Sequence, residues 1–294
     1  MRKIMKNIAF ILISICSLLR ISQAQQLDSL TLDTLHDAEI RLTGLGEQMI
    51  KAEKEDDRFT SAYMFLRTMS RALKTQNSFA YNFDSLKCVS IIHAPDNLFR
   101  IITWNLVTKE EKFHYYGVIQ MNPEMIKKVK DTSNLRLFYP LIDRSSKIKN
   151  PLDTIVDNEY WYGATYYKII LNNYKKNNYY TLLGWNGSNK MTNKKLVDVL
   201  HFEKNKPYFG APIFDLKKKK KYSRLVFEFS NSASMLLRYE PKKKILVYEN
   251  VSPTRVQDYG HPETYLPDGS YDFLLFKNGI WEKQQGMLKD FNME

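Results

Sequence analysis

Residues 271–283 read YDFLLFKNGIWEK, and this stretch decides the fold class. Two apolar runs flank Asn278-Gly279. Asn-Gly between apolar runs is the strongest short signal for a β-hairpin, because both central residues of the favoured tight turn need positive φ. The stretch therefore predicts two antiparallel strands that join at residues 278–279. Asn186-Gly187 and Asp268-Gly269 are similar pairs and predict similar turns.

The same pattern of short apolar runs and turn clusters extends back to about residue 78. We expect strands at residues 99–106, 113–121, 135–139, 162–172, 179–185, 196–202, 224–229, 235–239, 245–249, 271–276 and 280–283. Helix-length segments are missing between most of them, which disfavours a parallel βαβ sheet. We predict that residues 78–294 form a mainly β domain. It is an antiparallel meander closed as a barrel or a sandwich, with an irregular propeller as a third alternative.

Residues 25–77 have a helical pattern and form the predicted N-terminal helical segment. One stripe has apolar residues three and four apart, at Leu35, Ala38, Leu42, Leu45 and Met49. A second stripe comprises Ala62, Phe65 or Leu66, Met69 and Leu73. Such spacing lines one face of a helix. We expect a helical hairpin, or one long bent helix, that packs on the β domain, with Asp56 or Asp57 as the cap of the second half.

The first 24 residues have the three parts of a secretory signal peptide. Arg2, Lys3 and Lys6 precede an apolar run from residue 8 to residue 19, and Ser22-Gln23-Ala24 supplies a small-x-small cleavage site. We therefore expect an exported protein that is periplasmic, associated with the outer membrane, or secreted. Cleavage would remove four basic residues, so that the net charge falls from +12 to +8. Cys88 would remain as the single cysteine, without a partner for an internal disulfide.

Several phrases of the sequence occur together in a known group of proteins. They are Asn77-Ser78-Phe79, Asp84-Ser85-Leu86, Pro95-Asp96, residues 99–104 (FRIITW), residues 179–187 (YYTLLGWNG) and residues 267–272 (PDGSYD). With these phrases the chain resembles a family of uncharacterised exported proteins of Bacteroidetes. The resemblance covers most of the mature chain. It implies export and one compact unit, and no functional residue comes with it because the family has no established activity.

The densest group of candidate catalytic or metal-binding side chains lies near the carboxyl end. It comprises Asp258, His261, Glu263 and Asp268. Two carboxylates and an imidazole within six residues have the chemistry to hold a divalent metal or to act as an acid–base pair. The spacing matches no established zinc pattern, and a plain surface loop of good turn residues is the competing interpretation. Cys88 lies in an apolar run that favours a structural role over a nucleophilic one.

Lysine runs and aromatic residues indicate binding surfaces. Residues 217–221 are five consecutive lysines, and residues 242–244 are three more. Such patches attract anionic lipid, lipopolysaccharide or other acidic polymers, although lysines at hairpin tips also protect strand edges from pairing. Trp161, Trp185 and Trp281 and several tyrosine pairs have rings that suit stacking on sugars, although aromatic residues are also simply common in strands.

Two functions follow as hypotheses. The first is a non-catalytic envelope protein that binds an anionic polymer or a protein partner, without nucleic acid and at most peripheral to the membrane. The alternative is an extracytoplasmic, metal-assisted hydrolase centred on His261. No phosphate-binding loop, dinucleotide fingerprint, zinc-protease motif or nucleophile elbow occurs in the sequence, so we expect no organic cofactor.

Overall fold

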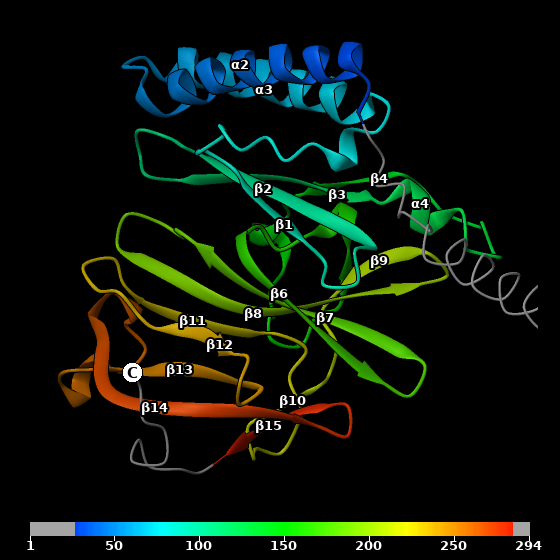
Figure 1. The fold of residues 1–294 in the computed structure, drawn as a ribbon. Coiled ribbons are helices and arrows are strands. Elements are labelled where there is room, and N and C mark those ends of the chain that lie inside the picture. The colour runs from blue at the N-terminus through cyan, green and yellow to red at the C-terminus, as the bar shows by residue number, and fades with distance from the viewer. Residues whose placement is uncertain (1–26, 285–294) are drawn as a thin grey trace, which may run out of the picture.

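The computed structural model describes residues 27–284. The predicted signal peptide lies outside these residues. The described chain is a stack of four layers, with two helices on top of three β-sheets (Figure 1). Among the described residues, no helix is both long enough and apolar enough to cross a membrane.

The top layer is the predicted helical hairpin. Helix α2 spans Ser29–Lys51 and helix α3 spans Glu55–Lys74, and they pack along each other. Asp28 caps α2 by accepting a hydrogen bond from the Thr31 backbone. Helix α3 begins two or three residues earlier than the predicted cap at Asp56 or Asp57 implies, with Lys54 at the cap position. Asp56 and Asp57 instead lie in the first turn, where the positive end of the helix dipole attracts their negative charge and stabilises the helix.

The first sheet has the strand order β1-β2-β3-β4 and lies directly under the helices. Its strands are β1 (Ser90–His93), β2 (Phe99–Val107), β3 (Phe113–Met121) and β4 (Phe138–Ile142). The short helix α4 (Pro123–Ile126) follows β3, and the turn η1 (Ser78–Ala80) follows α3.

The middle sheet has the order β5-β9-β8-β7-β6, with β11 paired to the first half of β8. Its strands are β5 (Val156–Asp157), β6 (Thr165–Tyr174), β7 (Asn177–Asn186), β8 (Thr192–Glu203), β9 (Lys206–Phe209) and β11 (Leu225–Ser230). The turns η2 (Ser145–Lys147) and η3 (Asn158–Tyr160) lie between β4 and β6 in the chain.

The third sheet has the order β10-β15-β14-β13-β12. Its strands are β10 (Phe214–Asp215), β12 (Leu237–Glu240), β13 (Ile245–Pro253), β14 (Tyr265–Lys277) and β15 (Ile280–Gln284). The turns η4 (Val256–Asp258) and η5 (Pro262–Thr264) connect β13 to β14. The quoted Asn-Gly hairpin is confirmed, because Asn278 and Gly279 have φ of 51° and 82° and join β14 to β15.

Three apolar cores lie between the four layers, and neighbouring residues of one strand belong to different cores. In β2, Ile101 faces the middle sheet and Ile102 faces the helices. In β7, Leu182 faces the first sheet and Leu183 faces the third. Side chains alternate between the two faces of a strand. Strands covered on both faces therefore contain continuous apolar runs, which explains why the sequence revealed them so readily.

The described residues confirm a mainly β body under two helices and correct its details. In the described chain, no sheet closes on itself. The predicted barrel is therefore wrong, and the sheets stack as in a sandwich. One pair, β10 with β15, is parallel within an otherwise antiparallel set. Gly187 has no positive φ. It is needed because a Cβ there would lie 2.2 Å from the Phe113 ring. Asp268-Gly269 lies inside β14 and does not form a hairpin tip.

Candidate functional site

The four residues predicted near the carboxyl end make three separate local contacts. Arg255 Nε lies 2.9 Å from Asp258 Oδ2, and His261 Nδ1 lies 3.2 Å from Glu263 Oε1. Asp268 accepts a hydrogen bond of 2.6 Å from the Ser270 hydroxyl, which lowers the pKa of its carboxyl group. The His261 side chain is 63% exposed. Within residues 27–284, no group of three or more His, Cys, Asp and Glu side chains is placed to hold a metal ion.

The aromatic candidates for sugar stacking are mostly interior. Trp161 and Trp281 are fully buried. The Trp161 indole donates to the Tyr166 hydroxyl, and the Trp281 indole donates to the Thr181 hydroxyl. Trp185 is half-buried, and its ring meets the Phe113 ring edge-on at 5.4 Å. These rings therefore pack the layers together.

Cys88 and the strand histidines also have packing partners. The Cys88 thiol is half-buried against Gly46 of α2, and burial raises its pKa, which opposes thiolate formation. The ring of His114 packs against Phe59 of α3, and the ring of His93 packs against Phe79. Burial lowers the pKa of His201, which lies 3.2 Å from Glu203.

A polar cleft of about 450 Å³ opens between the first and middle sheets. Its wall includes Tyr115, Asp143, Asn186, Ser188 and Lys194. This cleft could not be predicted from the sequence, because its residues come from segments far apart in the chain. Lysine, carboxylate and hydroxyl groups side by side give it the appearance of a small-molecule site.

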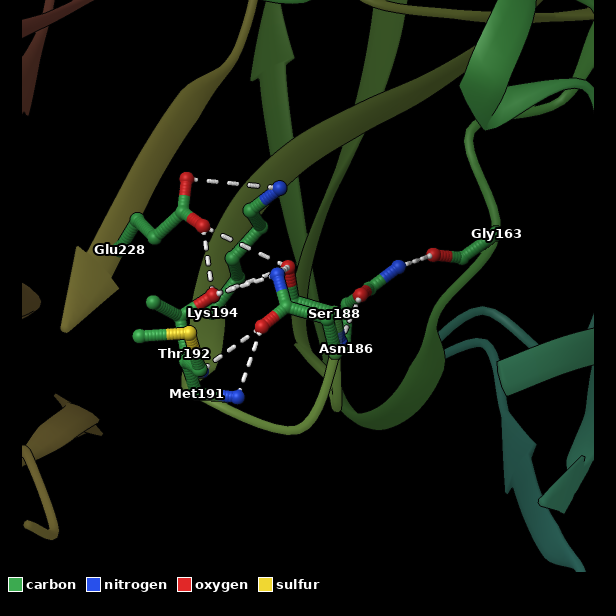
Figure 2. Close-up of polar contacts among 8 residues, drawn as sticks. Gly163, Asn186, Ser188, Met191, Thr192, Lys194 and Glu228 are labelled. Carbon is green, nitrogen blue, oxygen red and sulfur yellow. Dashed lines mark hydrogen bonds and ion pairs between the residues drawn. The ribbon is translucent and has the colours of Figure 1, made fainter. Parts of the chain in front are cut away.

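The polar groups beside this cleft are already paired with one another (Figure 2). Glu228 accepts a 2.6 Å hydrogen bond from Thr192 and lies 3.4 Å from the Lys194 ammonium group. Asn186 donates to the Gly163 carbonyl at 2.6 Å and accepts from the Ser188 backbone at 2.7 Å. A network that satisfies its own donors and acceptors holds the connection between β7 and β8 in one conformation. We conclude that its main role is structural.

Beneath the cleft lies a buried ion pair that the sequence did not reveal. Arg224 and Asp198 are both fully buried, with Nε and Oδ2 2.8 Å apart. The Arg224 guanidinium also lies over the Tyr162 ring, and Asp198 accepts a hydrogen bond from Tyr166. Burial raises the pKa of Tyr162, while Lys194 and Arg224 act against that rise. The pair ties β8 to β11 in the middle of the stack.

The two lysine runs of the sequence lie apart in the structure. Residues 217–221 form the exposed connection between β10 and β11, where Lys220 pairs with Asp153 at 2.7 Å. Residues 242–244 form the tip between β12 and β13, beside the end of β14, because Glu240 pairs with Ile245 and Ile245 pairs with Leu275. The longer run is therefore an isolated loop, whereas the shorter one belongs to a larger group.

That larger group, which we call the lysine end, consists of connections from all three sheets. Strand register places the tips β6–β7 and β8–β9 at one end of the middle sheet, and the tips β12–β13 and β14–β15 at one end of the third sheet. Gly279 packs on the Tyr174 ring, so these two ends coincide. Asn205 donates to the carbonyls of Asp131 and Ser133 and thereby joins the connection after α4 to the same end. In Figure 1 the lysine end is on the right.

The lysine end is strongly basic. Its connections are residues 94–98, 127–137, 175–176, 204–205, 241–244 and 278–279. They contain ten basic residues, all exposed: Lys127, Lys128, Lys130, Arg136, Lys175, Lys176, Lys204, Lys242, Lys243 and Lys244. They contain two acidic residues, Asp96 and Asp131, and Asp96 accepts a hydrogen bond from Tyr180. Ten positive and two negative charges leave a surplus of eight positive charges.

The opposite end, at the left in Figure 1, has no such surplus. Its connections are residues 108–112, 187–191, 231–236 and 254–264. They contain four basic residues, Lys109, Lys112, Lys190 and Arg255, and four acidic residues, Glu110, Glu111, Asp258 and Glu263. The positive charge of the hairpin connections is therefore concentrated at one end of the stack.

A comparison of the chain with models of protein families found no match, and a comparison with curated proteins also found none.

Proposed function

We propose that this protein is an exported, non-catalytic binding module that docks on an anionic lipid surface of the bacterial envelope through its lysine end. The observation that supports the proposal most strongly is the surplus of eight positive charges in the connections of that end, against none in those of the opposite end. The sequence pattern of a signal peptide supports export, and the family resemblance agrees with it.

The placement of the lysines on hairpin tips suits this role. Attraction between a lysine and an anionic surface decays within about 8 Å at physiological ionic strength. Tips are the parts of a sheet that come closest to an approaching surface. Each lysine close to an anionic leaflet contributes about 1 kcal/mol. Nine lysines and Arg136, distributed over the connections of three sheets, therefore give a strong attachment that depends on salt.

Sedimentation with lipid vesicles tests the proposal. The mature protein is mixed with phosphatidylcholine vesicles that contain or lack phosphatidylglycerol, at low and at high salt. We expect binding to the anionic vesicles alone, with weaker binding at high salt. Replacing Lys175, Lys176, Lys242, Lys243 and Lys244 by glutamine should weaken binding at least tenfold, since each lysine contributes about 1 kcal/mol.

The matched control replaces Lys109, Lys112 and Lys190 at the opposite end by glutamine, and should leave binding within about twofold of the wild type, because these lysines stay beyond a Debye length of the surface. Equal losses in the two variants, or equal binding to neutral vesicles, would contradict the proposal. Displacement by dextran sulfate with no binding to anionic vesicles would indicate an acidic polymer as the partner.

A further inference from the structure

A groove along α3 is an apolar feature that the lysine end does not itself explain. It lies between α3 and the outer face of β3 and β4, and has a volume of about 370 Å³. Leu66, Met69 and Leu73 line it from the helix, and Val118 and Phe138 line it from the strands. Helix α3 packs over β2, which leaves the outer face of β3 and β4 accessible beside it.

The groove continues in both directions along the sheet. A hollow of about 340 Å³ shares Leu66, Gly117 and Pro140 with it and reaches Ile142. A hollow of about 490 Å³ shares Leu73, Lys74 and Phe138 with it and reaches Lys127 of the lysine end. From Leu137, which directly precedes β4, to Ile142 at its end, the chain spans about 17 Å at 3.3 Å per residue. The combined shape is an elongated channel that suits a linear ligand.

Three apolar side chains along the groove and its two continuing hollows are exposed. Leu66 is 39% exposed, Leu137 is 42% exposed and Ile142 is 40% exposed. Contiguous exposed apolar side chains in one groove mark a binding site for an apolar partner, whereas scattered ones are ordinary. The floor of the groove also contains a polar group, the indole nitrogen of Trp104. Trp104 is 1% exposed, and its indole nitrogen has no hydrogen-bond partner within the described chain.

The charges at the groove select the kind of ligand. Lys74 and Arg136 line it, and neither forms an ion pair among residues 27–284. The groove then opens toward Lys127, which pairs with Glu124 at 2.7 Å, so that Lys74 and Arg136 are the cations left for a ligand. Apolar walls with cations at one mouth complement an acyl chain that ends in an anionic headgroup. An apolar peptide or a second copy of the protein would have no use for the cations.

We infer that the α3 groove holds one acyl chain of an anionic amphiphile, whose headgroup lies among Lys74, Arg136 and the lysine end. The inference rests on the proposed function and specifies its ligand. Electrostatic attraction brings the lysine end to the anionic surface. The groove then takes up a chain, so that the headgroup sets the charge preference and the chain length sets the affinity.

Fluorescence titration with single-chain amphiphiles tests this assignment. Dodecanoate is the probe, and a dodecanoate brominated along its chain quenches tryptophan on contact. We expect saturable quenching that disappears in the Trp104→Phe variant. Affinity should rise from octanoate to decanoate to dodecanoate by up to about fourfold per added methylene, since each buried methylene contributes about 0.8 kcal/mol.

Matched variants separate the groove from the surface. Leu66→Asp should weaken dodecanoate binding at least tenfold. Leu30→Asp on α2, at a leucine that is 77% exposed and away from the groove, should leave it within about twofold. Lys74→Gln with Arg136→Gln should weaken binding of dodecanoate several-fold and leave binding of the neutral dodecanol unchanged. Circular dichroism confirms that each variant is folded.

The outcomes distinguish this inference from the proposed function. Absence of saturable quenching, equal affinity across chain lengths, or a Leu66→Asp protein with normal affinity would overturn the groove assignment, even if the protein still sediments with anionic vesicles. Self-association that Leu66→Asp abolishes would also overturn it, because the groove would then bind a second copy. Saturable binding to the groove without vesicle binding would instead overturn the docking of the lysine end.

Discussion

The two ends of the stack are made from the same kinds of hairpin connections, yet they differ in whether their charged and polar groups are balanced. At the opposite end, acids and bases are equal in number, and the polar groups beside the cleft are hydrogen-bonded to one another. At the lysine end, the connections contain ten exposed basic residues and two acids. Polar groups that pair with one another stabilise a fold, whereas a surplus of like charge adds repulsion to it. The difference teaches that a crowded polar cleft is a weaker sign of function here than a simple surplus of charge.

The largest effect is expected at the buried Asp198–Arg224 pair in the middle of the stack. Asp198→Ala should lower the free energy of unfolding by about 3–5 kcal/mol, because it leaves a buried guanidinium without its partner. Urea denaturation measures this. The double variant Asp198→Leu with Arg224→Met should recover most of the loss. A single variant as stable as the double one would show that the pair does not hold the middle sheet.

A smaller loss should follow from opening the network of Figure 2. Glu228→Ala removes the acceptor of the Thr192 hydrogen bond and the partner of Lys194. We expect a loss of about 1–2 kcal/mol in urea denaturation, with vesicle binding unchanged. Glu53→Ala, at an exposed glutamate after α2, is the control and should change stability by less than about 0.5 kcal/mol. Loss of vesicle binding in Glu228→Ala would indicate that the binding surface lies at the opposite end, and would contradict its assignment to the lysine end.

The lysine end should show the reverse pattern. Replacing Lys242, Lys243 and Lys244 by glutamine should change the free energy of unfolding by at most about 0.5 kcal/mol per substitution. It should even raise stability slightly at low salt, since it relieves repulsion. Binding to anionic vesicles should fall in the same protein. A substantial loss of stability would mean that these lysines serve the fold, and the contrast between the ends would fail.

The smallest effect concerns pH at the lysine end. Burial places the pKa of His201 below its ordinary value of about 6.5. The unfolded chain therefore binds the proton first as pH falls, and stability decreases as pH falls through about 6.5. Urea midpoints at pH 7.5, 6.5 and 5.5 should decline in the wild type and decline less in His201→Gln. An equal decline in both proteins would assign the pH dependence to other groups.

Local sequence patterns predicted the elements better than the sites. The turn at Asn278-Gly279 and the helix face at Leu35, Leu42 and Met49 depend on neighbours within a few residues, and both were correct. The second stripe was also correct, and of its two alternatives Phe65 is buried while Leu66 faces the groove. Short strands such as β5 and β10 were not predicted, because two residues are too few to show the apolar–polar alternation of a strand.

The groupings across layers depend on register, which a single sequence does not reveal. Asp198 and Arg224 are 26 residues apart, and only the pairing of β8 with β11 brings them together. The lysine end escaped prediction for the same reason. Lysines beside predicted turns were visible one at a time, and counting which turns share an end of an antiparallel sheet would have revealed part of the group. The sequence itself shows only the contiguous runs at residues 217–221 and 242–244, and the second of these belongs to the lysine end.

The central claim is that the lysine end, and not the opposite end, meets an anionic lipid surface. An environment-sensitive dye on a single introduced cysteine measures this directly. In a Cys88→Ser background, Thr132→Cys labels the lysine end and Ser234→Cys labels the opposite end, both at exposed residues. With phosphatidylglycerol vesicles, we predict a blue shift and quenching by lipid-borne quenchers at position 132 and no change at position 234. A response at position 234 alone, or at neither position, would contradict the account.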